Sequence, residues 1–333
     1  MNAADWAKRL AALVLAAAVV VSVAGAGAVL AERSQEAPAE PLDTPEYAPS
    51  NVDVDYLQAS GQIQVNRSAA TGDGTVVIDK GHGNRFSQAD IQPMVEALTR
   101  VGYDVEFYTG GDLAAQLEDA KAFVVIDPSQ EFEPGDVDDV RRFTGQGGHL
   151  LLVGEPTQIT VGGGLFGTGI RTQQPRLTTL TTPYGMTVDT AYLYNQENAD
   201  ANYKWITARP TDAEGLDGIE RTTMYTAAEV TVNGGTVLLR SSPNTLKSST
   251  DDQSGQYPVA VRKREVVLVG DSTFLTEGRY RVADNEAFAA YLVRFLASSD
   301  RTPGTDISGA DEETGTDGPT PGGNDTSTTV DID

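Results

Sequence analysis

The sequence of 333 residues contains no cysteine, only 2 histidines and only 6 lysines. The absence of cysteine excludes disulfides, zinc or iron–sulfur sites with thiolate ligands, and enzymes with a cysteine nucleophile. Lys and Arg together number 24 against 48 Asp and Glu, which gives a formal net charge of −24 at pH 7. Such a chain has no large basic surface to offset phosphate repulsion, so we expect no nucleic-acid partner.

The acidity has a particular composition, because Asp outnumbers Glu by 29 to 19 and Arg outnumbers Lys by 18 to 6. An ordinary acidic protein is one interpretation. The other, which we favour, is a halophilic and haloarchaeal protein, whose short carboxylates hold water and cations at the surface. Net charge concerns solvation and not fold. Isolated surface carboxylates in this chain are therefore weak indicators of a site.

One long apolar run lies near the N-terminus, where residues 10–31 carry no charge. A helix of this length rises ~1.5 Å per residue and can cross a hydrocarbon core of ~30 Å. We predict a single-pass membrane anchor. A cleaved signal peptide is the alternative, because residues 26–28 (Ala-Gly-Ala) resemble a cleavage site, and the protein would then be secreted. Lys8 and Arg9 precede the run and predict a cytoplasmic N-terminus (residues 1–9), with the rest outside the cell membrane.

Polar segments flank the central part of the chain. Residues 32–70 are rich in Pro and acidic residues and predict a linker between the anchor and a folded domain. Residues 298–333 are dominated by Asp, Glu, Gly, Pro and Thr and predict a disordered acidic tail. Asn66 and Asn324 each begin an Asn-x-Ser/Thr tripeptide and are candidate glycosylation sites in an external domain.

Between residues 71 and 297, short apolar segments alternate with amphipathic ones. Ser87 to Asp90 has the pattern of a capping box at the start of a helix, and Gly102 is placed to end that helix. Strand and helix alternating with short connections predict a parallel sheet with helices on both faces. The predicted strands span residues 75–79, 104–108, 122–126, 149–153 and 264–270, and the later helices begin near Pro134 and at Asp284.

The alternation is interrupted by residues 156–260, which are rich in Gly, Thr and Tyr and contain short strand-like pieces. We interpret this segment as a β-rich insertion of strands and loops within the α/β domain. The alternation resumes after it with the segment REVVLVG.

Four segments between residues 74 and 297 carry a resemblance to a known family: VVIDKGHGNRFS, AFVVIDPSQEF, FTGQGGHLLLVGEPTQ and VVLVGDSTFLTEGRYRVADNEAF. In this order they resemble the domain-of-unknown-function 4350 family. That family is similar to class I glutamine-amidotransferase-like domains, including those of gliding-type ABC transport accessory proteins. The resemblance implies a flavodoxin-like sandwich on a membrane anchor, often with MoxR-type ATPase neighbours. It implies no established reaction, and the lack of cysteine excludes amidotransferase activity here.

Acidic residues follow four of the predicted strands: Asp79, Asp127, Glu155 and Asp271. Ligands bind to parallel sheets at the carboxyl ends of the strands. If the strand order brings Asp79, Glu155 and Asp271 together, their oxygens would suit a divalent cation such as Mg²⁺ or Ca²⁺. The alternative is that each carboxylate caps the turn that follows its strand.

The loop after the first strand, residues 80–86, combines two glycines with His82, Asn84 and Arg85. His82 is the leading candidate for acid–base chemistry because its charge changes near neutral pH. The alternative is that His82 and Asn84 brace the loop through backbone hydrogen bonds. The other members of the predicted ligand-binding rim are Ser129, Ser272 and Asn285, and neither serine has the flanking glycines of a hydrolase nucleophile.

Two functions fit these observations. The first is a membrane-anchored, non-catalytic binding or assembly domain without a cofactor, which recognises a protein partner at the membrane. The second is a hydrolase assisted by a divalent metal, using Asp79, His82 and Asp271. The missing nucleophile favours the first.

Overall fold

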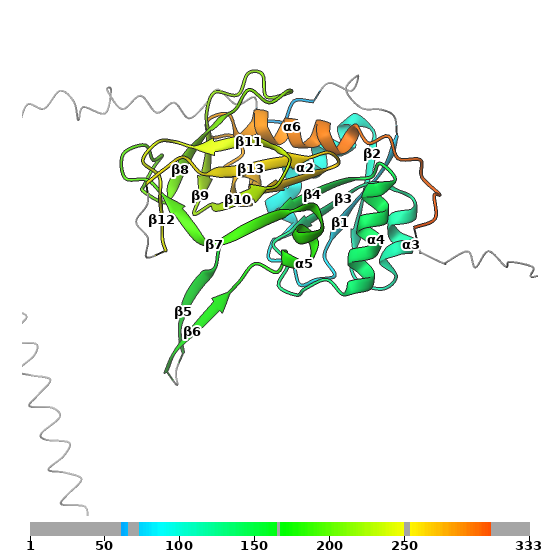
Figure 1. Cartoon of the computed structure of the whole chain (residues 1–333), viewed down its shortest axis with the longest axis horizontal. Helices are drawn as coiled ribbons and strands as arrows, with labels where there is room; N and C mark the ends of the chain where they lie inside the picture. Colours follow the sequence, from blue (N-terminus) through cyan, green and yellow to red (C-terminus); the bar gives the residue numbers. More distant parts are fainter. Residues whose placement is uncertain (1–60, 66–72, 165–166, 250–253, 308–333) are drawn as a thin grey trace, which may run out of the picture. The chain divides into compact units, whose positions relative to one another are not determined.

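The computed structural model describes residues 61–65, 73–164, 167–249 and 254–307 (Figure 1). Within these residues, nine strands form one sheet in the order β2-β1-β3-β4-β14-β13-β11-β8-β9. The first five strands are parallel, and each strand from β13 onward is antiparallel to its neighbours. The sheet therefore has a parallel half and an antiparallel half.

The parallel half consists of short strands, of which the four inside the edge strand β2 are apolar and largely buried. Along β1, Val76 and Ile78 belong to one hydrophobic cluster and Val77 to the other, as strand alternation requires. The strands, in sheet order, are β2 (Tyr103–Tyr108), β1 (Gly74–Asp79), β3 (Ala120–Ile126), β4 (His149–Val153) and β14 (Val266–Val269).

Helices cover the two faces of the parallel half in pairs. On one face α2 (Gln88–Val101) contacts α6 (Asn285–Ala297), and on the other α3 (Leu113–Glu118) contacts α4 (Pro134–Gly145) (Figure 1). The predicted α/β class, with a large sheet between two helical layers, is confirmed.

The ends of α2 and α6 show where local sequence signals were sufficient to predict helix capping. The capping box of α2 is present, with the side chains of Ser87 and Asp90 each accepting the other's backbone N–H, and Gly102 ends the helix at a φ of 104°. The helix α6 begins where the sequence predicts, but the side chain of Asp284 does not cap it. Asp284 precedes the helix, but its carboxylate accepts the N–H groups of Glu220 and Arg221. A tertiary contact has replaced the local cap.

The antiparallel half comes from the segment that the sequence predicts to be an insertion. Its strands continue the main sheet rather than standing apart from it, because β13 pairs directly with β14, with Ala260 opposite Val269. The strands are β13 (Pro258–Lys263), β11 (Thr236–Ser241), β8 (Trp205–Pro210) and β9 (Thr222–Tyr225).

The same segment also builds two smaller sheets. One of them, with the order β10-β7-β12, packs against β13 through β10, and the other is a two-stranded hairpin that projects from the domain (Figure 1). A single helical turn, α5 (Thr178–Thr181), follows the hairpin. The bounds are β10 (Ala228–Val232), β7 (Met186–Tyr194), β12 (Leu246–Lys247), β5 (Gln158–Gly164) and β6 (Gly167–Gln173).

The folded domain is longer than the sequence predicts. Ile63, inside the predicted linker, is 1% exposed, and Arg301 and Ile307, inside the predicted tail, are also 1% exposed. The tail prediction is therefore wrong for residues 298–307. The apolar residues Ile63 and Ile307 are isolated in polar segments, so they create no helix or strand periodicity in the sequence, although both side chains pack in the core.

None of the described helices is long and apolar enough to cross a membrane. The predicted anchor at residues 10–31, the remainder of the tail from residue 308, and the candidate glycosylation sites Asn66 and Asn324 lie outside the described residues.

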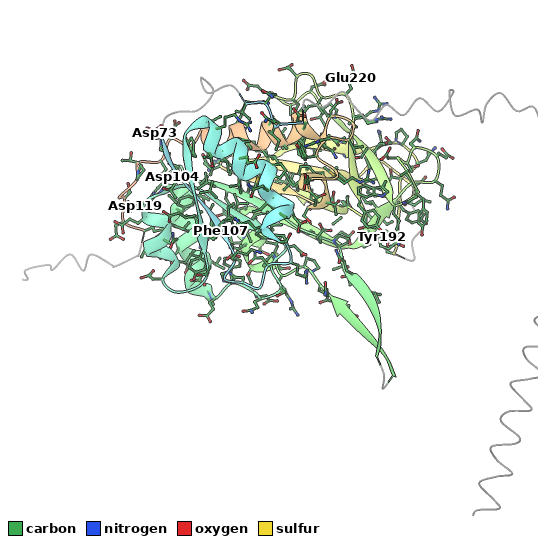
Figure 2. All side chains as sticks on the ribbon, turned by 180° about the vertical axis from the view of Figure 1, so that it is seen from behind. Asp73, Asp104, Phe107, Asp119, Tyr192 and Glu220 are labelled. Carbon is green, nitrogen blue, oxygen red and sulfur yellow. The ribbon has the colours of Figure 1, made fainter. Side chains whose placement is uncertain are left out.

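The strand at one edge of the main sheet, β2, carries the exposed acidic residue Asp104 (Figure 2). Charges on an edge strand oppose pairing with a strand of another molecule. The charge of Asp104 thus disfavours pairing at this edge.

The side chain of Arg301 ties the C-terminal segment to the domain. It donates hydrogen bonds to the carbonyl oxygens of Glu118, Ala120 and Thr305 at 2.6, 2.8 and 2.7 Å. We expect Arg301→Ala to lower the free energy of unfolding by about 3 kcal/mol, because it leaves buried carbonyls unsatisfied. Urea denaturation measures the loss. The control Arg141→Ala removes an exposed ion pair with Asp138 and should lower the free energy of unfolding by less than about 1 kcal/mol. Equal losses in the two variants would contradict the role of Arg301 in holding the C-terminal segment.

Candidate functional site

The carboxyl ends of β1, β3, β4 and β14 form a rim of buried acidic side chains. Asp79, Asp127, Glu155 and Asp271 are between 0% and 3% exposed. The sequence predicted these positions, because each acid directly follows an apolar strand or lies within two residues of its end. The structure shows how each one is held.

Asp79 organises the loop after β1. Its Oδ1 accepts the backbone N–H of Gly81 at 3.0 Å and lies 2.9 Å from Nδ1 of His82, while its Oδ2 accepts the Asn84 amide at 3.0 Å. The same Asn84 nitrogen also donates to the carbonyl oxygen of Ile126 at 3.0 Å. Both oxygens of Asp79 are therefore engaged within the fold, as expected for a turn-capping acid.

His82 lies between two carboxylates on the α4 side of the sheet. Its Nε2 is 3.7 Å from a carboxylate oxygen of Asp136, opposite the contact with Asp79. The imidazole stacks on Phe132, with ring centroids 3.5 Å apart. Burial raises the pKa of Asp136, and the nearby His82 offsets part of that rise. Asp136 was not predicted from the sequence, because its proximity depends on how α4 packs.

Ser129 braces this loop. Its hydroxyl donates to the carbonyl oxygen of Gly83 at 2.8 Å, and its backbone N–H donates to the carbonyl oxygen of His82 at 3.1 Å. Gly83 has a φ of 64°, and a Cβ there would lie 2.4 Å from the Ser129 hydroxyl oxygen. Both facts require glycine at this position. Ser129 thus fixes the loop rather than presenting a free hydroxyl.

Arg85 and Asp127 form a paired charge on the opposite side of the loop. Nε of Arg85 donates to Oδ2 of Asp127 at 2.7 Å, and Nη2 donates to Oδ1 at 2.5 Å. Asp127 has a φ of 39°, in the left-handed region that residues with side chains seldom adopt. The bidentate geometry gives the pair a fixed orientation.

Glu155 and Asp271 are a second pair, of like charge. Glu155 Oε1 accepts the backbone N–H and the hydroxyl of Ser272 at 2.7 and 2.5 Å. Asp271 accepts from the hydroxyl and N–H of Thr273 and, at 3.3 Å, from the N–H of Tyr225 in β9. Burial raises the pKa of Glu155 well above its usual value, and the neighbouring Asp271 raises it further. Burial also raises the pKa of Asp271 to about 6.

A pocket of about 460 Å³ opens at this part of the rim. Its lining comes from the carboxyl ends of β3, β4 and β14 and from the loop and helix that follow β1, at the edge of the parallel strands where ligands bind in such sheets. The base of the projecting hairpin forms one wall through Gln158 and Gln173, neither of which was predicted from the sequence. The remaining lining residues are Arg85, Phe86, Asp90, Ile91, Ile126, Asp127, Glu155, Ser272, Thr273 and Thr276.

The predicted site residues thus separate into two groups. Asp79, His82 and Asn84 form one group, and Arg85, Glu155 and Ser272 border the pocket. Asp79 does not join Glu155 and Asp271, because β3 separates β1 from β4. Among the described residues, no group of three His, Asp or Glu side chains has the geometry to hold a metal ion.

Asn285 has a different role from the predicted one. It is fully buried, and its amide accepts the N–H of Thr223 at 2.9 Å and donates to the carbonyl oxygens of Thr223 and Arg279, each at 3.0 Å. These bonds join β9 to the start of α6. The side chain is a structural brace and contributes no free group to the rim.

A known family matches most of the folded domain. The family described as "Domain of unknown function (DUF4350)" matches residues 91–293. The chain belongs to the DUF4350 family. No curated protein matches the chain.

Solved structures resemble this DUF4350 chain at low identity. The structure titled "mmIFT52 N-terminal domain" has a TM-score of 0.53 at 11% identity, covering 68% of this chain and 99% of that one. A putative ThuA-like protein from Bacteroides uniformis has a TM-score of 0.42 at 10% identity, covering 72% and 96%. A cytoplasmic protein from Salmonella typhimurium has a TM-score of 0.43 at 12% identity, covering 68% and 98%. The first of these three indicates a shared fold and, at 11% identity, nothing beyond the fold.

The raised pKa values of Glu155 and Asp271 predict a pH dependence of stability. A carboxyl group whose pKa is raised on folding stabilises the protein most below its unfolded pKa of about 4, and that contribution is lost as pH rises through the folded value of about 6. Glu155→Gln keeps the acceptor for Ser272 and removes one buried charge. We expect the variant to gain stability relative to the unmodified chain between pH 4 and 7, by about 1 to 3 kcal/mol.

Chemical denaturation of both proteins across this pH range measures the difference. The exposed Glu214→Gln is the matched control and should give a flat difference. If the stability difference between Glu155→Gln and the unmodified chain were also independent of pH, burial of the Glu155 and Asp271 pair would not destabilise the ionised form.

Proposed function

We propose that this DUF4350 chain is a membrane-anchored, non-catalytic binding domain whose rim pocket holds a small ligand or a side chain of a partner protein. The order β2-β1-β3-β4-β14 supports a flavodoxin-like arrangement, and a pocket at the carboxyl ends of these strands supports binding there. The predicted anchor and the resemblance to amidotransferase-like accessory domains support a protein partner at the membrane, in a transport or MoxR-type ATPase system.

The engagement of the rim groups inside the fold is the observation that carries this proposal. Asp79 is held by three donors, Asp127 by the Arg85 guanidinium, and the Ser129 hydroxyl by the Gly83 carbonyl. A catalytic nucleophile and its base must instead be free to reach a substrate. The leading acid–base candidate, His82, is buried, contacts Asp136 of α4 and is not among the residues that line the pocket.

Binding at the pocket is tested by closing it. Thr276 is a half-buried residue of the pocket wall, so Thr276→Trp should fill the opening. We expect fragments found by thermal shift on the full chain to lose at least tenfold in affinity in this variant. Thr302→Trp, at an exposed position, is the control and should bind as the unmodified chain does. Equal binding by all three proteins would place the ligand elsewhere and contradict the proposal.

Catalysis is tested separately with chromogenic esters, amides and phosphoesters, with and without Mg²⁺ or Mn²⁺. We expect no turnover that differs between the unmodified chain and His82→Ala. Turnover that disappears in His82→Ala would identify an enzyme and overturn the non-catalytic assignment.

A further inference from the structure

Glu155 borders the pocket and forms, with Asp271 behind it, a buried carboxyl pair. Glu155 and Asp271 are 2% and 0% exposed, and neither forms an ion pair with a Lys, Arg or His among the described residues. An isolated buried carboxylate is costly, so such a group either takes up a proton, as the raised pKa values of this pair indicate, or pairs with a cation. The described residues supply no such cation, so a cation from outside can take the place of the proton.

The cation nearest the pocket is already committed. Arg85 directs two of its nitrogens at Asp127 and a further hydrogen bond at the carbonyl oxygen of Gln174. Asp90 also lines the pocket, and its carboxylate accepts the backbone N–H of Ser87 in the capping box of α2. The charged groups that face Glu155 are thus Asp271 from β14, Asp127 from β3, its partner Arg85 and, across the pocket, Asp90.

One oxygen of Glu155 is left without a partner inside the fold. Oε1 accepts both hydrogen bonds of Ser272, and no hydrogen bond to Oε2 is made by any described residue. Glu155 itself lines the pocket. This oxygen borders an open pocket and has no donor among the described residues, so it can accept a hydrogen bond from outside the fold.

The shape and lining of the pocket select the kind of cation. Phe86, Ile91 and Ile126 supply apolar walls, and Ser272 and Thr276 supply hydroxyl groups. A volume of about 460 Å³ is large for a bare ion and suits a small organic molecule. The described residues also offer no three-carboxylate cluster for a metal.

We propose that the rim pocket binds an organic ammonium group, as in an amine ligand or an amino terminus, with its N–H donors directed at Glu155 and its apolar body against Phe86 and Ile91. This assignment rests on the proposed function, since it names the ligand class of the same pocket. The ammonium supplies the positive charge that the Glu155 and Asp271 pair lacks. Its binding is strongest at a pH where that pair is ionised and weakens on acidification, because protons compete for the same oxygens.

Isothermal titration of the full chain with benzylamine tests this assignment. Benzyl alcohol and benzoate are neutral and anionic probes of similar shape, and MgCl₂ tests a metal. The titrations are run at pH 7.5 and pH 5 in both low and molar KCl, because high salt screens attraction to the acidic surface. We expect that, of the four probes, only benzylamine binds at pH 7.5. Its affinity should be at least tenfold weaker at pH 5, and its binding at pH 7.5 should persist in molar KCl.

The matched variants separate the site from the surface. Glu155→Gln should weaken benzylamine binding at least tenfold, Glu214→Gln should leave it unchanged, and Thr276→Trp should block it. Equal affinity in Glu155→Gln, or binding of Mg²⁺ in preference to the amine, would overturn the ammonium assignment. Binding of benzyl alcohol or benzoate that only Thr276→Trp abolishes would overturn it while leaving the pocket as the binding site. Absence of binding by every probe, together with fragment binding that Thr276→Trp leaves intact, would overturn both proposals.

Discussion

The burial of carboxyl groups at the ends of parallel strands is the constraint on which the rest of this rim depends. Asp79, Asp127, Glu155 and Asp271 are all removed from water, and each needs donors or a counter-charge. The loop after β1 is shaped around Asp79, and the turn after β14 is shaped around Asp271. Internal donors engage both oxygens of Asp79, whereas at Glu155 the described residues supply donors to Oε1 alone.

Both halves of the sheet contribute to this part of the rim. The parallel half supplies the strand ends, while the antiparallel half supplies the backbone N–H of Tyr225 to Asp271. The hairpin base contributes Gln158 and Gln173 to the pocket wall. The segment between β4 and β14 is therefore part of the site. It completes a pocket that the parallel strands alone would leave open on one side.

The same residue type has different physical consequences at different places in this chain. Exposed acids such as Asp104 on β2 are solvated and protect the sheet edge. Buried acids at the strand ends carry raised pKa values, or are paired, because water cannot solvate them. An acidic composition conceals this distinction, since the composition counts all 48 Asp and Glu equally.

The sequence by itself determined the local features of the fold. Apolar segments of four to seven residues specified the five parallel strands, and the Ser87 and Asp90 capping box and Gly102 specified the ends of α2, because these signals act between residues close in the chain. The acids at the strand ends were recognisable for the same reason. Membership in the DUF4350 family was also recognisable from ordered segments of sequence.

Only the tertiary structure decided which of these groups meet. The order β1-β3-β4-β14 separates Asp79 from Glu155 and joins Glu155 to Asp271, and strand order depends on long-range packing that no local pattern encodes. The place of Asp136 beside His82, the use of Asn285 as a brace, and the burial of Arg301 in a polar tail have the same origin. Each depends on a contact between segments distant in the chain, where the energy of burial and hydrogen bonding outweighs local propensity.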